Sequence, residues 1–144
     1  METTDNANAE LLARLSEGKS VLFAPRGISM LPFIQGGRDK VLVRKEEEIS
    51  IGDIVLVFHG NHLILHRVYA IDGTRLTLMG DGNIKGNEVV EESDVWGKVV
   101  EIIRPDGRCS KPRKARLWRH TLPFRRLMLK IRRKWYKLRG LNPE

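Results

Sequence analysis

The feature that most constrains the fold is a series of short apolar runs, rich in β-branched residues and separated by Gly, Asp and Asn. These runs are about five residues long, far below the roughly 20 apolar residues that a membrane-spanning helix needs. They predict strands at residues 21–23, 40–44, 54–58, 63–71, 75–79 and 95–103. We therefore expect a mainly β fold, a coiled antiparallel β domain rather than alternating βαβ units.

Both ends of the chain are expected to be helical. In residues 8–17 the leucines recur at helical spacing, and Gly18 follows as a stop. From Pro123 to Gly140 apolar residues recur at helical spacing between Arg and Lys, which predicts a basic amphipathic C-terminal helix. The apolar residues of that pattern are Phe124, Leu127, Met128, Ile131, Trp135 and Leu138.

Charge divides the chain into two parts. The net charge is +8, but residues 1–107 carry 12 basic and 17 acidic side chains, while residues 108–144 carry 14 basic and one acidic. We predict an N-terminal helical segment (1–18), a β domain (19–107), a basic linker (108–122) and a cationic helix and tail (123–144).

The polar, acidic N-terminus shows no secretory signal, so we expect a cytoplasmic protein, peripheral at the membrane at most. The sequence has a single cysteine, Cys109, which excludes an internal disulfide framework. We expect neither a metal nor an organic cofactor.

Three short motifs carry candidate chemistry. Ser29 lies between a glycine and a Met-Leu-Pro sequence, on irregular backbone where a hydroxyl can face a cleft. His66 lies within an apolar strand, where an imidazole can act as a general base. Its neighbour Arg67 points to the opposite face and is expected at the surface, solvated or in a salt bridge. Asp81 lies between two glycines at a turn and can orient an imidazole.

The order of these motifs resembles the signal peptidase I superfamily, the clan of serine endopeptidases that includes the self-cleaving SOS repressors. The similarity covers about residues 19–104 and rests on five boxes, the His-Arg-Val box being closest to the archaeal and endoplasmic-reticulum type. These boxes are Gly-Ile-Ser-Met-Leu-Pro (27–32), Gly-Asp-Ile-Val (52–55), His-Arg-Val (66–68), Gly-Asp-Gly-Asn (80–83) and Gly-Lys-Val (97–99). The chain looks like a minimal member, without membrane anchors or a large second β domain.

The resemblance implies a serine endopeptidase that removes a leader or signal segment through an acyl-enzyme. Ser29 would be the nucleophile, His66 the base and Asp81 the supporting acid, with Ile28 and Met30 beside Ser29 at the oxyanion and substrate site. The His type usually has a second Asp where this chain has Asn87, and the adjacent Glu88 is the candidate auxiliary acid. The alternative is a non-catalytic or regulatory peptide-binding module with the same fold. A self-cleaving repressor is disfavoured, since His replaces the Lys of such proteins and no helix-turn-helix precedes the β domain.

The cationic helix allows three interpretations. It can lie on an anionic membrane surface through residues 123–139, as basic amphipathic helices with aromatic residues do. Its apolar stripe can instead pack on the β domain or on a partner. Nucleic acid is the least favoured partner, because no recognition motif accompanies the charge. A peptide or protein substrate is the expected partner of the β domain, and oligomeric state is left open.

Overall fold

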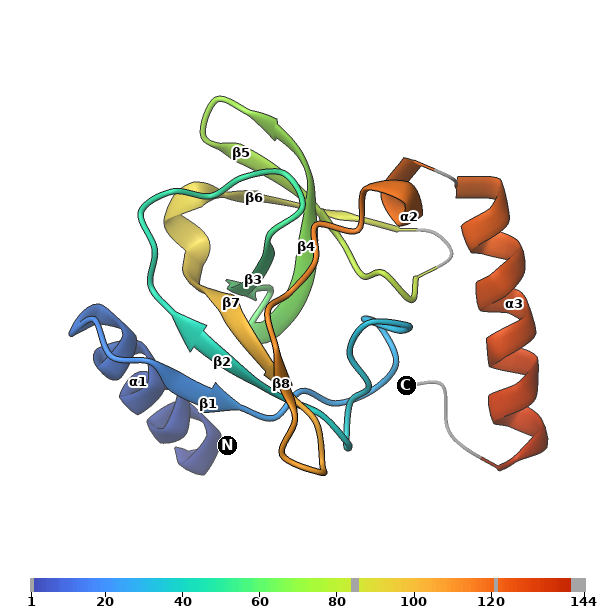
Figure 1. Ribbon diagram of the computed structural model, residues 1–144. Helices are drawn as coiled ribbons and strands as arrows, with labels where there is room; N and C mark the ends of the chain where they lie inside the picture. Colours follow the sequence, from blue (N-terminus) through green and yellow to red (C-terminus); the bar gives the residue numbers. More distant parts are fainter. Residues whose placement is uncertain (1, 84–85, 121, 141–144) are drawn as a thin grey trace.

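The computed structural model describes residues 2–83, 86–120 and 122–140 (Figure 1). Its first half contains α1 (Glu2–Ser16), β1 (Val21–Phe23), β2 (Lys40–Arg44), β3 (Ile54–His59) and β4 (His62–Asp72). Its second half contains β5 (Arg75–Met79), β6 (Glu88–Glu91), a 3-10 turn η1 (Glu92–Asp94), β7 (Val95–Ile103), β8 (Cys109–Ser110), α2 (Arg116–His120) and α3 (Leu122–Leu138).

The described strands form one curled antiparallel sheet, which confirms the predicted fold class (Figure 1). The strand order is β1-β2-β7-β3-β4-β5-β6, and β8 adds to β7. Tight hairpins set the register at the centre: Gly60 and Asn61 both have positive φ, +58° and +67°, as a two-residue type I′ turn requires. That turn places β3 beside β4 with Val55 opposite His66.

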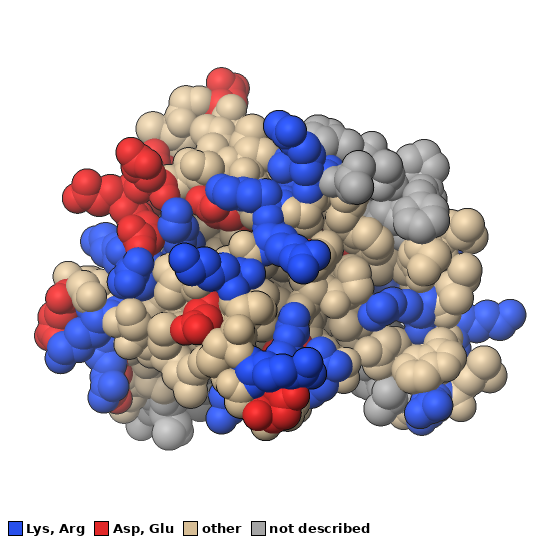
Figure 2. Space-filling model, viewed as in Figure 1, with Lys and Arg blue, Asp and Glu red and all other residues tan. Residues whose placement is uncertain are grey.

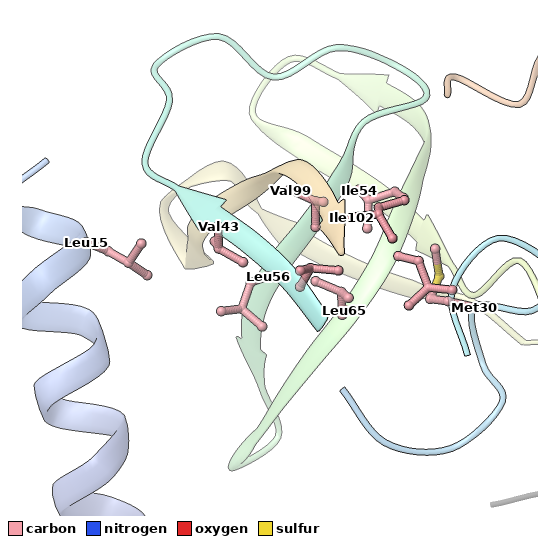
Figure 3. Close-up of a cluster of buried hydrophobic side chains, with 10 residues drawn as sticks. Leu15, Met30, Val43, Ile54, Leu56, Leu65, Val99 and Ile102 are labelled. Atoms are coloured by element: carbon pink, nitrogen blue, oxygen red, sulfur yellow. The ribbon is translucent and has the colours of Figure 1, made fainter. Parts of the chain in front are cut away.

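The sheet buries apolar side chains on both faces. One cluster joins sheet residues such as Leu56 and Val99 to Met30 from the β1–β2 connection and to Leu15 from α1 (Figure 3). A second cluster lies around Val55, Leu78 and other residues of β3 to β6. Burial on both faces explains why β3 is apolar without alternation over Ile54–Val57.

The elements depart from the prediction at three places. The first helix begins at Glu2, earlier than expected, and β6 was not predicted at all. The expected linker 108–122 contains β8 and α2. The long C-terminal helix begins at Leu122, and Pro123 lies in its first turn as predicted. Among the described residues, no helix is both long and apolar enough to cross a membrane.

Candidate active site

Ser29 lies on a turn in the connection between β1 and β2. Gly27 enters the turn with a φ of +78°, a conformation that favours glycine. Ile28 O accepts a hydrogen bond from Leu31 N at 3.1 Å, which closes the turn around Ser29 and Met30. Because Ile28 and Met30 are buried, they anchor the turn on both sides of the half-buried serine.

The loop that contains Gly80, Asp81 and Gly82 packs directly against this turn. Gly82 N donates a hydrogen bond to Ser29 O at 2.7 Å. A Cβ at Gly80 would collide with the Ser29 carbonyl oxygen, and one at Gly82 would collide with Ile28 O. The two glycines are therefore required by the close approach of two backbones, and they fix the position of the candidate nucleophile.

Ser29 and His66 line the same cavity, which has a volume of about 440 Å³. His66 is on β4 and only 6% exposed. The pairing of β5 with β4 begins at Arg67, so β5 does not cover residues 62–66 of β4, and these residues form one wall of the cavity. Residues 23–27, which lead to Ser29, line it as well. The fold therefore brings the predicted nucleophile and base to one cavity, beside a stretch of strand edge.

The carboxylate against His66 is that of Glu88, the auxiliary acid of the sequence analysis. His66 Nδ1 lies 2.9 Å from Glu88 Oε2, and the two side chains are 8% and 24% exposed. Glu88 reaches this place because β6 pairs with β5, the next strand after β4. An ionised carboxylate accepts a hydrogen bond from Nδ1–H, which leaves Nε2 as the basic nitrogen of the neutral ring.

Asp81, expected to support His66, is instead held by Arg67. The guanidinium donates from Nε to Oδ1 at 2.8 Å and from Nη2 to Oδ2 at 2.7 Å, and both side chains are fully buried. Tyr69 Oη also donates to Asp81 Oδ1, at 3.3 Å. The expectation of a surface position for Arg67 was wrong: strand alternation turns it into the interior, where the carboxylate compensates its charge.

The segment after β8 closes over this buried ion pair. Arg67 Nη1 donates to the backbone oxygens of Gly52 and Arg113, and Trp118 Nε1 donates to Asp81 O at 3.0 Å. The ring of Trp118 meets that of Phe33 edge to face, with centroids 6.0 Å apart. Sequence reasoning missed these contacts, because a basic segment rich in Lys and Arg is typical of an exposed linker.

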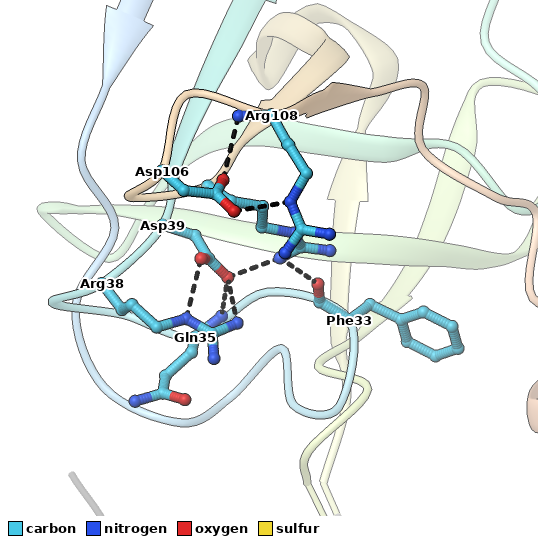
Figure 4. A network of polar contacts seen from close by, with 7 residues as sticks. Phe33, Gln35, Arg38, Asp39, Asp106 and Arg108 are labelled. Atoms are coloured by element: carbon cyan, nitrogen blue, oxygen red, sulfur yellow. Dashed lines mark hydrogen bonds and ion pairs between the residues drawn. The ribbon is translucent and has the colours of Figure 1, made fainter.

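A third carboxylate, that of Asp39, fixes the chain that follows Ser29. Asp39 is buried and accepts hydrogen bonds from Gln35 N at 2.8 Å, Arg38 Nε at 2.9 Å and Arg104 Nη1 at 2.6 Å (Figure 4). Arg104 also donates to Phe33 O at 3.0 Å. Burial by itself raises the pKa of Asp39, but these donors outweigh it and the pKa is lowered from its ordinary value. The connection from Ser29 to β2 is thereby fastened to the end of β7.

Comparison with known protein families gives a match over most of the β domain. A model of the family described as Peptidase S24-like matches residues 4–100, about two thirds of the chain. That range includes the Ser29 turn, His66, Asp81 and Glu88. No curated protein sequence matches the chain significantly. Because this family model matches well over half of the chain, including most of α1, strands β1 to β6 and every candidate site residue, the chain belongs to the Peptidase S24-like family.

Proposed function

We propose that the chain is a serine endopeptidase in which Ser29, His66 and Glu88 form the catalytic set. The observation that carries this proposal is the cavity shared by Ser29 and His66, together with the carboxylate on the far nitrogen of His66. A nucleophile, a base and an acid that orients the base are the parts that acyl transfer by serine requires. Asp81 acts indirectly in this proposal: it holds the loop that packs on the Ser29 turn.

The reaction follows from these roles. Ser29 Oγ attacks the carbonyl carbon of a peptide bond while His66 Nε2 takes the hydroxyl proton. The tetrahedral oxyanion is stabilised by backbone N–H groups of the turn, at Ser29 and Met30, with Ile28 beside them. His66 then gives its proton to the leaving amine nitrogen, and the C–N bond breaks to leave an acyl-serine. Water, deprotonated by His66, releases the acyl group and restores the serine.

The substrate in this proposal is a peptide in extended conformation, laid along residues 62–66 of β4. A strand edge recognises such a peptide through its backbone, which gives affinity with little demand on sequence. Removal of a leader or signal segment, as in the His-type signal peptidases that the sequence resembles, is the specific activity that we propose. The His-Arg-Val box supports it through His66, since the imidazole stands where the repressors use Lys.

The test uses the full chain, its Ser29→Ala variant and a complex peptide library read by mass spectrometry. Ser110→Ala, an exposed serine on β8, is the matched control. We expect cuts with wild type and with Ser110→Ala and none with Ser29→Ala. Cuts that persist in Ser29→Ala would refute the role of Ser29. Specific peptide retention without any cut would show the non-catalytic binding module instead.

A further inference from the structure

The helix α3 packs on the rest of the protein through residues that its amphipathic pattern did not indicate. Leu129 is 2% exposed and Tyr136 is 6% exposed. Four residues of the predicted apolar stripe face solvent instead, with exposures of 56% for Leu127, 54% for Ile131, 48% for Trp135 and 79% for Leu138. At 100° per residue, this exposed row lies on the side of the helix opposite Leu129 and Tyr136.

Exposed cations border this apolar row. Lys130 and Lys134 lie on one side of it and Arg132 and Arg139 on the other, all exposed. Residues 122–140 contain no Asp or Glu. In the view of Figure 2, the charges visible at α3 on the right are Lys and Arg, and Asp and Glu gather toward the left. The α3 face that points outward is therefore apolar along its centre and cationic along both margins.

We propose that this outward face of α3 (Leu127, Ile131, Trp135, Leu138 and the bordering Lys and Arg) binds an anionic lipid membrane, with the helix lying in the headgroup plane. The exposed apolar row is matched by a partner with a hydrocarbon interior. The Lys and Arg on both sides of the row are matched by negative charge at the surface of that partner. An anionic bilayer supplies both. Nucleic acid offers phosphate but nothing to cover three aliphatic side chains. A second copy of the face would set cation against cation.

The same helix supports the Ser29 turn from its inner face. Tyr136 packs on Ile28 and Leu31, which flank the turn. Arg133 Nη2 lies 3.4 Å from Gly82 O, and Gly82 N bonds Ser29 O. Membrane binding therefore places the candidate active site at the lipid surface through the element that positions Ser29. This consequence rests on the proposed function, whereas the binding itself does not.

The experiment measures binding of the full chain to vesicles by co-sedimentation. We compare vesicles of phosphatidylcholine that contain about one-third phosphatidylglycerol, an anionic lipid, with vesicles of phosphatidylcholine alone. The test variant is Ile131→Ser with Leu138→Ser, which removes exposed apolar groups and keeps every charge. The matched control is Leu22→Ser with Val89→Ser, at sites 52% and 56% exposed on β1 and β6. Far-UV circular dichroism checks that each variant is folded.

We expect wild type and the Leu22/Val89 control to bind the anionic vesicles, and the Ile131/Leu138 variant to bind about tenfold more weakly. Trp135 emission should shift to the blue on binding, a shift that Trp135→Phe removes. Equal binding of both double variants would overturn the proposal, because charge alone would then explain it. So would an absence of binding, a lipid-free dimer that the Ile131/Leu138 variant dissociates, or tighter binding to an RNA oligonucleotide than to vesicles. Because none of these readouts uses peptide cleavage, failure here leaves the proposed function standing.

Discussion

Two neighbouring residues of β4 show how differently one motif can be used. His66 and Arg67 each pair with a carboxylate from later in the chain, at 2.9 Å to Glu88 and 2.7 Å to Asp81. In the first pair His66 lines a cavity and both side chains are partly exposed, whereas the second pair has no exposed side-chain surface. Strand alternation sends the two side chains to opposite faces. We infer that the partly exposed pair, His66–Glu88, takes part in catalysis. The fully buried pair, Arg67–Asp81, which we call the sealed pair, stabilises the fold.

The largest expected effect is on catalytic activity, and it comes from a change at His66, which lines the cavity. His66→Gln removes the base but keeps much of the volume, so we expect kcat/KM on a cleaved peptide to fall about 10³-fold or more. The free energy of unfolding should change by about 1 kcal/mol or less, because among the described residues the ring makes one polar contact, at the edge of a cavity. Peptide cleavage and urea unfolding measure the two quantities. His59→Gln, in the exposed β3–β4 hairpin, is the control and should keep wild-type activity.

The sealed pair should behave in the opposite way. Asp81→Asn leaves the Arg67 guanidinium buried without its compensating charge, which we expect to cost about 3 kcal/mol of unfolding free energy. Replacing both partners, as Arg67→Met with Asp81→Leu, should cost less than the single change, since no charge then stays buried. Urea denaturation followed by circular dichroism measures both variants. A loss under about 1 kcal/mol in Asp81→Asn would contradict the structural role of this pair.

Glu88→Gln sharpens the comparison further, because it alters a carboxylate while keeping its shape. Without the anion, the imidazolium that forms during attack loses stabilisation, so kcat should fall about 10- to 100-fold. Unfolding free energy should change by less than about 1 kcal/mol, as for other partly exposed pairs. Steady-state kinetics at several pH values measure the effect. If Asp81→Asn lowers activity without a stability loss while Glu88→Gln is silent, the assignment of the two carboxylates must be exchanged.

The strands were predictable from the sequence because turn residues and β-branched runs fix them locally. The Asp72-Gly73 turn and the runs around it gave β4 and β5 within one residue. The short β6 was missed because Glu88 and Glu91 flank only two valines, a pattern with little strand character. Pairing of β6 with β5 brings Glu88 to His66 across 22 residues, a contact that no local pattern encodes.

The placement of the candidate site residues was predictable where local motifs determine it and was not predictable where burial determines it. Ser29 and His66 follow from short motifs whose backbone context is local. The roles of the two acids depend on which side of β4 each one meets, and the charge of Arg67 favours a surface position over the interior. The cationic helix has the same ambiguity: its pattern defines an apolar stripe, but Leu129 and Tyr136 outside that stripe make the contact with the protein.

The smallest expected effect is at Asp39. It tests whether a second buried carboxylate, besides Asp81, stabilises the fold in a way that depends on pH. The pKa of Asp39 is lowered in the folded protein, chiefly by Arg38, the Gln35 backbone and Arg104 acting against burial. A folded pKa below the unfolded value of about 3.9 means that this stabilisation is present above about pH 4 and is lost as pH falls through the lower folded value. We therefore expect Asp39→Asn to lower the unfolding free energy by about 1 kcal/mol at pH 7. The difference from wild type should shrink below pH 4, whereas Glu47→Gln, at an exposed carboxylate, should match wild type throughout. Thermal unfolding between pH 2.5 and 7 measures this, and a difference that does not depend on pH would mean that Asp39 stabilises the loop through its shape rather than its charge.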